Sequence, residues 1–176
     1  MKKIKIIALY EKPYGNANKI LRRIKFAFPH INLINFCTTN KNLKKTIYID
    51  TQTFIDKVIN GDLVEAGSQG DSFIGTDIIN LKKDKINIGI FSVDRINCLI
   101  TDDRLDILPI EIITSNFICL KHMLKKYKNN KSCIDICKKF LENQKNEEED
   151  FNSIRYVIKR NHFRELKNYI NAFDQK

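Results

Sequence analysis

Residues 12–21, KPYGNANKIL, decide how the start of this chain is expected to fold. They follow Lys3–Tyr10, an isoleucine-rich run that is bounded by polar residues and predicts a buried strand. Ile20 and Ile24 then recur at helical spacing, and this helix is expected to stop before Pro29. A strand, a loop that contains proline and glycine, and a helix are therefore expected in that order.

Strand-like and helix-like segments alternate along the rest of the chain, which is typical of a parallel sheet covered by helices. Further strands are expected at Ile31–Phe36, Leu63–Ala66, Ser72–Ile74, Asn87–Val93, Leu108–Thr114 and Ile154–Ile158, with a turn at Gly67–Gly70. Helices are expected after Asp50 (apolar side Phe54, Val58 and Ile59, stop at Gly61), at Phe117–Tyr127, from Ser132, and at the end of the chain (Phe163, Leu166, Ile170 and Phe173). Right-handed crossovers would make this a doubly wound α/β sheet with a small β-rich insert.

Length, charge and cysteine content limit the class of protein. A chain of 176 residues with 43% hydrophobic residues is expected to form one globular domain. No apolar run approaches the roughly 18 residues that a membrane span needs, so we expect a cytoplasmic protein without a membrane partner. The net charge of +10 favours anionic partners such as nucleotides or acidic proteins; nucleic acid is not the expected one.

The five cysteines have no disulfide-framework spacing and are expected to be reduced. Two close pairs, Cys119 with His122 and Cys133 with Cys137, offer four ligands of the types that bind zinc. Both pairs lie on predicted helices, whereas structural zinc is usually held by turns. We therefore predict no metal site.

The segment Phe54–Thr76 resembles the nucleotide-acceptor part of the guanylate kinase family. A helix that ends in glycine leads to an acidic strand, Gly61-Asp62-Leu63-Val64-Glu65, and then to the pair Gly75-Thr76. The resemblance implies that Glu65 accepts hydrogen bonds from the guanine N1–H and 2-amino group, with the Thr76 hydroxyl beside the base. Taken alone, Glu65 is more typical of a solvent-facing strand carboxylate.

A second segment, Cys37-Thr38-Thr39-Asn40, resembles the phosphate-binding Thr-Thr-Arg of the same family. The resemblance implies that Thr38 and Thr39 hold an anion. Asparagine replaces the first arginine, and the second has only Lys41, Lys44 or Lys45 as a counterpart. A lysine supplies charge without the bidentate fork of arginine, so a phosphate would be held less directionally.

The family resemblance also implies a division of the chain. It implies one P-loop kinase-like domain, 1–176, with a core of 1–34 and 76–176, an acceptor-binding insert at 35–75 and a helical lid at about 126–150. Ser92-Val93-Asp94 matches the acidic motif of the central strand, which makes Asp94 a candidate ligand-binding residue. In the lid, Lys138 and Lys139 stand where the family has paired arginines.

The loop at 12–21 lacks the residues that grip ATP and magnesium. Aligned with the family's phosphate-binding loop, it has Lys12 at the first glycine, retains Gly15, and has Asn18 at the lysine and Lys19 at the serine or threonine. A working loop needs that lysine at the β- and γ-phosphates and that hydroxyl on Mg²⁺. Phosphoryl transfer depends on both, so little turnover is expected.

Three functions remain open from the sequence. The first is a degenerate guanylate kinase homologue that binds a guanine nucleotide or a related anionic small molecule. The second is an active kinase with a rearranged loop, in which Lys19 and Lys139 are catalytic and Mg-ATP is the cofactor. The third is a non-catalytic scaffold whose lysine-rich acceptor cleft captures an acidic or phosphorylated protein.

Overall fold

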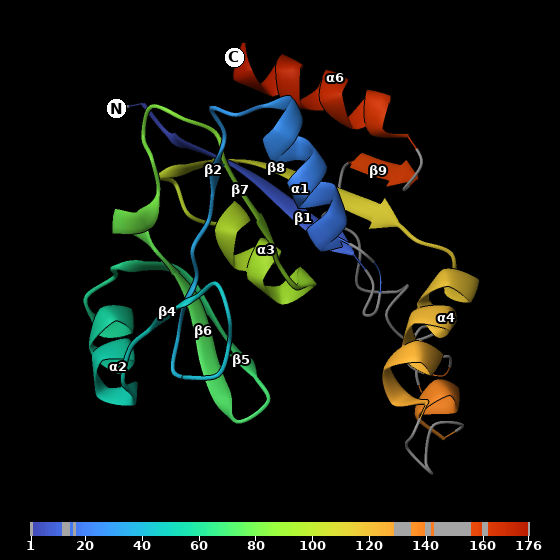
Figure 1. Cartoon of the computed structure of the whole chain (residues 1–176). Helices are drawn as coiled ribbons and strands as arrows, with labels where there is room; N and C mark the ends of the chain where they lie inside the picture. Colours follow the sequence, from blue (N-terminus) through green and yellow to red (C-terminus); the bar gives the residue numbers. More distant parts are fainter. Residues whose placement is uncertain are drawn as a thin grey trace. The chain divides into compact units, whose positions relative to one another are not determined.

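The structure is a computed structural model, and it describes residues 2–11, 15, 17–128, 135–139, 142, 156–159 and 162–175. The chain forms two compact units. One comprises Met1–Ala8 and Lys25–Leu108, and the other comprises Leu9–Ile24 and Pro109–Lys176. Figure 1 follows the chain through its helices and strands.

A five-stranded sheet confirms the α/β prediction. Its strands are β1 (Ile4–Glu11), β2 (Asn32–Leu33), β7 (Asn87–Ile90), β8 (Leu105–Ile113) and β9 (Tyr156–Lys159), in the order β2-β7-β1-β8-β9. The pairs β2–β7 and β8–β9 are parallel, with Asn32 opposite Asn87 and Ile110 opposite Tyr156. Ile6, Ile7 and Leu9 are completely buried in β1, as expected for a parallel strand covered on both faces.

Four of the helices that the structure describes are α1 (Ala17–Ala27), α3 (Val93–Ile100), α4 (Asn116–Tyr127) and α6 (Phe163–Asp174), with a further helical segment at 135–139. All but α3 were predicted from the sequence. In α1, Ile20 and Ile24 are buried, and in α6 Leu166, Ile170 and Phe173 are buried. The guanidinium of Arg23 lies 4.2 Å from the ring centroid of Phe163, so α1 and α6 are in contact within their unit.

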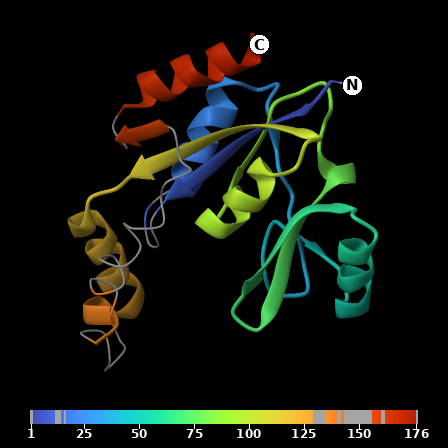
Figure 2. The ribbon, with the colours of Figure 1, turned by 180° about the vertical axis from the view of Figure 1, so that it is seen from behind.

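A smaller four-stranded sheet lies within Lys25–Leu108, in the first of the two units. Its strands are β3 (Cys37–Thr38), β4 (Ile47–Tyr48), β5 (Leu63–Gln69) and β6 (Ser72–Asp77), in the order β4-β3-β6-β5. The helix α2 (Thr51–Ile59) packs against β5 and β6, and the helix α3 packs against β5 (Figure 2). A 3-10 turn, η1 (Ile78–Asn80), follows β6. This sheet lies where the β-rich insert is predicted; the exact insert boundaries, 35–75, stay a prediction.

Four sequence expectations need correction. Gly67 is not in a turn: it pairs with Ile74 within β5, and the hairpin turns later at Gly70, whose φ of +60° suits glycine. The strand predicted at 31–36 is only two residues long in β2. The strand predicted at 87–93 ends at Ile90, because Val93 already begins α3.

The fourth correction concerns α2. Asp50 caps this helix by accepting a hydrogen bond from the Thr53 N–H, and Gly61 ends it with a φ of +71°, as predicted. Phe54 is buried, but Val58 and Ile59 are 48% and 75% exposed. The apolar face of α2 is therefore only partly covered. The predicted lid falls largely outside the described residues, and so do Ser132, Cys133 and Ile154.

Candidate functional site

A buried carboxylate lies at the centre of the candidate site. Glu65 is in β5 and is 4% exposed. The β5–β6 register places it opposite Thr76, which is completely buried, just after an irregularity between Leu63 and Glu65. The Thr76 hydroxyl donates to Oε1 of Glu65 at 2.5 Å. The two residues that were predicted to contact a base therefore lie side by side.

Both oxygens of the Glu65 carboxylate are also bound by Arg95, from α3. The Arg95 Nε donates to Oε2 at 2.5 Å, and Nη2 donates to Oε1 at 2.5 Å. The side chains are 9% and 0% exposed for Arg95 and Glu65 respectively. This is the bidentate arrangement in which two parallel N–H bonds join a planar fork to a carboxylate.

Two aromatic rings hold the Arg95 guanidinium in place. Its Cζ lies 4.6 Å from the ring centroid of Phe36 and 5.0 Å from that of Phe91. The two rings are perpendicular, with centroids 5.2 Å apart. Cation–π attraction to both rings adds to the ion pair, because the site is shielded from water.

The sequence prediction missed Arg95 because it assigned the preceding residues to a strand. The sequence holds two signals of a helix start there, because Ser92 is of a type common at helix N-caps and Asp94 stands in the first turn. Ile96 and Leu99 then recur at helical spacing and are buried. A buried arginine requires an acidic partner. Glu65 is therefore buried and paired, and it is not the solvent-facing strand carboxylate that was the alternative to the family resemblance.

The two threonines of the predicted anion site differ in what their hydroxyls can still bind. Thr38 is completely buried; its hydroxyl donates to the Phe73 carbonyl at 2.7 Å and accepts from the Asn40 N–H at 3.2 Å. The Thr39 hydroxyl accepts from the Phe73 N–H at 2.9 Å and keeps its own proton for another acceptor. Thr39 is the better anion donor of the two.

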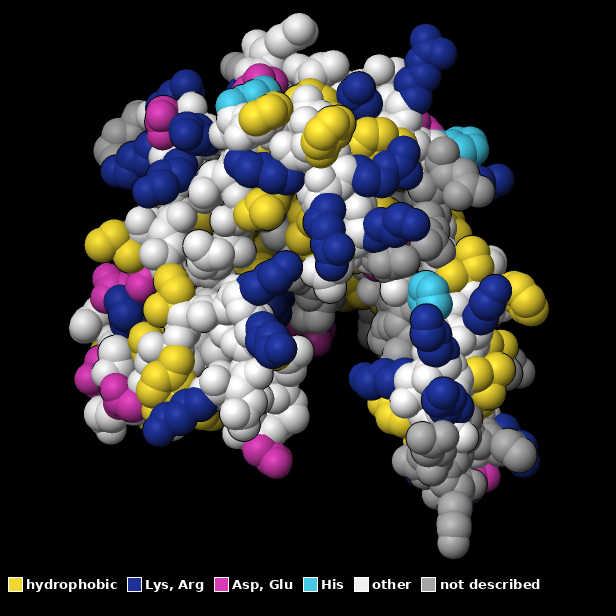
Figure 3. Space-filling view, viewed as in Figure 1, with side chains coloured by type: hydrophobic (Ala, Val, Ile, Leu, Met, Phe, Trp, Pro, Cys, Tyr) yellow, Lys and Arg dark blue, Asp and Glu magenta, His cyan; other side chains and the backbone are white. Residues whose placement is uncertain are grey.

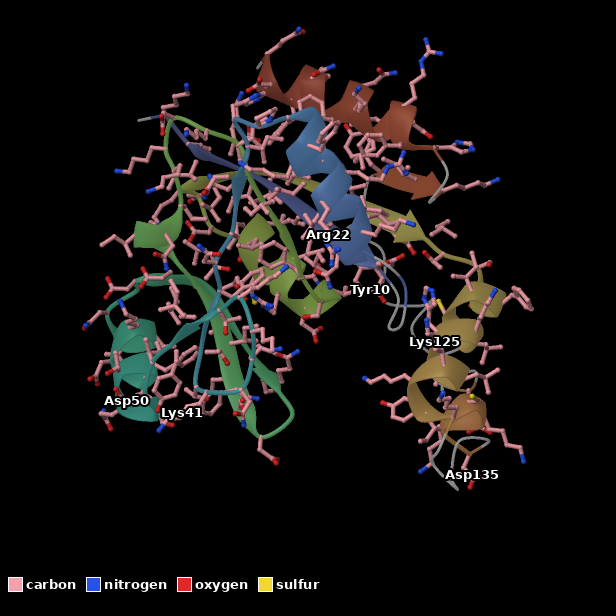
Figure 4. The ribbon with its side chains drawn as sticks, in the orientation of Figure 1. Tyr10, Arg22, Lys41, Asp50, Lys125 and Asp135 are labelled. Atoms are coloured by element: carbon pink, nitrogen blue, oxygen red, sulfur yellow. The ribbon has the colours of Figure 1, made fainter. Side chains whose placement is uncertain are left out.

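The other charged residues that were predicted to bind the ligand, Lys41, Lys44 and Asp94, are all exposed. The Lys41 ammonium lies 5.1 Å from the ring centroid of Tyr48 in β4, and Figure 4 labels Lys41. Lys44 is exposed on the same loop. Asp94 is exposed one residue before Arg95, at the start of α3. None of the three belongs to the buried Glu65 cluster.

A buried thiol and an ion pair border the cluster. The Cys37 Sγ donates to the Gly75 carbonyl at 3.3 Å. Burial, reinforced by the negative charge of Asp77, raises the pKa of the Cys37 thiol. Asp77 is paired with Lys57 of α2 at 2.7 Å, and its hydrogen bond raises the pKa of Lys57. Cys37 is therefore protonated and unreactive at neutral pH.

In the other unit, a carboxylate lies against the loop that follows β1. Glu11 is the last residue of β1, and its carboxylate accepts a hydrogen bond from the hydroxyl of Thr114, which is buried. A Cβ on Gly15 would overlap the Glu11 side chain. The Glu11 side chain therefore lies directly against Gly15.

The predicted catalytic lysines are both exposed. Lys19 lies in the first turn of α1 beside the exposed Asn18, and Lys139 lies on the helical segment at 135–139. Lys12 lies outside the described residues.

The described part of the chain has neither a metal-binding cluster nor a membrane-spanning helix. No group of three or more His, Cys, Asp and Glu side chains there could hold a metal ion. Cys119 is instead buried with Met123, and Cys137 packs against them. None of the helices described is long and apolar enough to cross a membrane.

Comparison with known proteins identifies the fold. No protein-family model matches the chain, and no curated protein matches its sequence. Among solved structures, the crystal structure of guanylate kinase from Anaplasma phagocytophilum resembles it with a TM-score of 0.58 and 19% sequence identity. The match covers 98% of this chain and 86% of that chain. The chain therefore has a guanylate kinase-like P-loop fold.

Proposed function

We propose that this chain is a catalytically degenerate guanylate kinase-like protein that binds a guanine nucleotide without efficient phosphoryl transfer. Glu65 and Thr76 would bind the base. The Thr39 hydroxyl and the lysines at 41 and 44 would bind the phosphate. The observation that carries this proposal is the buried carboxylate of Glu65, which already accepts two parallel N–H bonds from a planar group.

The stereochemistry of that contact suits guanine. Guanine presents its N1–H and 2-amino group side by side in one plane, as a guanidinium presents Nε–H and Nη2–H. A carboxylate pairs with two such adjacent donors, and adenine does not offer them. The Phe36 and Phe91 rings, which lie against the guanidinium, would also suit the flat face of a purine.

The loss of transfer follows from the loop after β1. The Glu11 carboxylate would repel the phosphates of a nucleoside triphosphate. Asn18 and Lys19 replace the lysine and the hydroxyl residue that such a loop needs for phosphate and Mg²⁺. Each of these changes weakens transition-state stabilisation, so their combination predicts a very slow reaction.

Isothermal titration with GMP, dGMP and guanosine tests the binding proposal. We expect saturable heat with all three, because all carry the guanine edge, and weaker binding of guanosine, which has no phosphate. Circular dichroism on the same sample serves as the folding control. A folded protein that gives no heat with any of the three ligands would refute the proposal.

A coupled ADP-release assay with ATP, Mg²⁺ and GMP tests the absence of transfer. We expect no turnover above the rate of a protein-free control. The competing hypothesis of an active kinase, with Mg-ATP as cofactor, predicts GMP-dependent ADP release that Lys19→Ala or Lys139→Ala abolishes. Such a result would replace a binding function with a catalytic one.

A second candidate function is supported by an apolar groove of about 380 Å³ between α2 and the β5–β6 hairpin. Its apolar residues include Ile55, Val58, Ile59 and Phe73, which are 40%, 48%, 75% and 43% exposed. Figure 3 shows hydrophobic side chains at the surface over α2. Such a groove would suit the apolar residues of an acidic or phosphorylated peptide whose charge meets the lysines at 41 and 44.

Fluorescence anisotropy with phosphoserine peptides of varied apolar sequence tests this scaffold function. We expect Val58→Asp to abolish binding, because it places a charge in the groove. The charge reversals Lys41→Glu and Lys44→Glu should weaken binding as well. Binding that survives all three changes would exclude this groove as the peptide site.

A further inference from the structure

The contact between Arg95 and Glu65 has a consequence for any ligand of the site. Resting on the proposed function, we infer that Arg95 is an internal competitor for the Glu65 carboxylate and thereby sets both the affinity and the selectivity of the site. The guanidinium takes the position that the ligand's two-donor edge would need. A ligand therefore binds by displacing Arg95 from Glu65.

The hydrogen-bonding capacity of the carboxylate supports competition rather than simultaneous binding. Oε1 already accepts from Thr76 and from Nη2 of Arg95, each at 2.5 Å. Oε2 accepts from Nε of Arg95 at 2.5 Å. A second planar fork would have to approach along the directions that the first one occupies.

Burial makes the exchange selective. Removing one partner of a buried ion pair is costly, because it leaves an uncompensated charge. A ligand can displace Arg95 only when it returns two donors to Glu65, as a guanine edge does. A ligand with one donor or none would leave the carboxylate under-satisfied, so Arg95 would exclude it.

The surroundings of Arg95 provide a place for the incoming group. Phe36 and Phe91 lie against the guanidinium, and Gly67 has no side chain on the Arg95 side. A Cβ on Gly67 would lie 3.4 Å from both Cγ and Cδ of Arg95. Once the guanidinium leaves, two aromatic faces and the carboxylate edge are released together.

The test compares GMP affinity in the wild type, Arg95→Met and a charge-matched control, Arg104→Met. Arg104 lies at the surface, with its side chain 46% exposed, and pairs with Asp102. We expect Arg95→Met to lower the dissociation constant for GMP by about 10- to 100-fold. This is the change that corresponds to the free energy of a hydrogen bond to a charged group. Arg104→Met should leave the dissociation constant for GMP within about twofold of the wild-type value, because exposed ion pairs contribute little. AMP should gain nothing from either change.

A second measurement follows Arg95 in the wild type and does not depend on a variant that folds. The Nε–H resonance of Arg95 can be assigned in NMR spectra of the wild-type protein by through-bond correlation with the rest of its side chain and its backbone amide. We expect this resonance to shift and to exchange faster with solvent as GMP is added, with a midpoint that matches the calorimetric dissociation constant. AMP at the same concentration should leave it unchanged.

The outcomes separate this inference from the proposed function. GMP binding to the wild type with an unmoved Arg95 resonance, or with an unchanged constant in folded Arg95→Met, overturns the inference and leaves the function standing. GMP binding to Arg95→Met but not to the wild type supports the inference and overturns the function for the native chain. No GMP binding to either protein overturns both.

Discussion

The Thr76 hydroxyl donates to a carboxylate that is shut off from solvent. Thr76→Val keeps the shape of the side chain and removes this donor. We expect the free energy of unfolding, measured in urea, to fall by about 1.5–3 kcal/mol, the range for a hydrogen bond to a charged group.

The matched control for this prediction is Thr101→Val. The Thr101 hydroxyl donates to the Cys98 carbonyl at 2.8 Å, but at an exposed helix end. Its loss should change the free energy of unfolding by about 0.5 kcal/mol or less. Equal effects of the two substitutions would mean that the Glu65 cluster has no special energetic role.

Glu11 gives a second prediction for a single residue. Because its negative charge lies against Gly15, the wild type should bind Mg-ATP weakly, and Glu11→Gln should tighten this binding by about tenfold. Equilibrium dialysis with labelled ATP measures the effect. Glu165→Gln, which removes a partly exposed charge from α6, is the control. Tight ATP binding by the wild type would contradict the role given to Glu11.

At the residue scale, Glu65 and Thr76 were singled out because the segment Phe54–Thr76 resembles the guanylate kinase family. The contact partners that only the fold brings together were missed. Arg95 was missed because its partner lies 30 positions earlier in the chain. Glu11 was missed because its contact with Thr114 joins residues 103 positions apart.

Among the elements, the β5–β6 hairpin depends on the absence of a side chain at Gly75. A Cβ there would lie 2.9 Å from the backbone oxygen of Glu65 and 3.3 Å from Cζ of Phe54. We expect Gly75→Ala to lower the free energy of unfolding by about 1–3 kcal/mol, because the clash is with backbone that cannot rotate away. Urea unfolding measures this loss. The control is Ser68→Ala, an exposed substitution in the same hairpin, which should leave the free energy of unfolding almost unchanged. If Gly75→Ala also leaves it unchanged, the two strands can move apart without cost.

The turn that joins α3 to β8 gives a pH-dependent prediction. The Arg104 guanidinium hydrogen-bonds Asp102 and holds the pKa of that carboxyl below its ordinary value of 3.8. Since the folded pKa lies below the unfolded one, the contribution to stability is complete above about pH 5. It is lost as the pH falls below the unfolded value of 3.8 and through the lower folded pKa. Asp102→Asn should therefore destabilise the protein more at about pH 6 than at about pH 3.

Urea unfolding of the wild type and Asp102→Asn at both pH values checks the sign. The difference between the two proteins should shrink in acid. A difference that stays constant would show that the Asp102 carboxyl has the same pKa in the folded and unfolded chains.

Helices were predictable where the local sequence, in its apolar spacing and its caps, determines them. The helices α1, α4 and α6 follow their apolar spacing, and α2 begins and ends at its predicted cap and glycine. The helix α3 was missed because the apolar run before it continues to Val93, which is typical of a strand. The turn at Gly67–Gly70 was placed too early because glycine within a strand resembles a turn when the pairing partner is unknown.

At the scale of the whole molecule, the proposed function depends on one contact in each of the two units. In one, the Arg95 guanidinium occupies the carboxylate that a base would need. In the other, the Glu11 carboxylate accepts a hydrogen bond from Thr114 and lies against Gly15. The α/β architecture was predictable because alternating strands and helices determine it. The pairing of Arg95 with Glu65 was not predictable, since it joins residues that are distant in the sequence.

Calorimetric comparison of GMP with AMP on the wild-type protein tests the central claim most directly. The two ligands share the ribose and the phosphate and differ in the edge that Glu65 would bind. We predict saturable GMP binding at least about 100-fold tighter than that of AMP, because AMP leaves the buried carboxylate without its two donors. AMP binding as tight as that of GMP, or no GMP binding by the folded protein, would contradict the account.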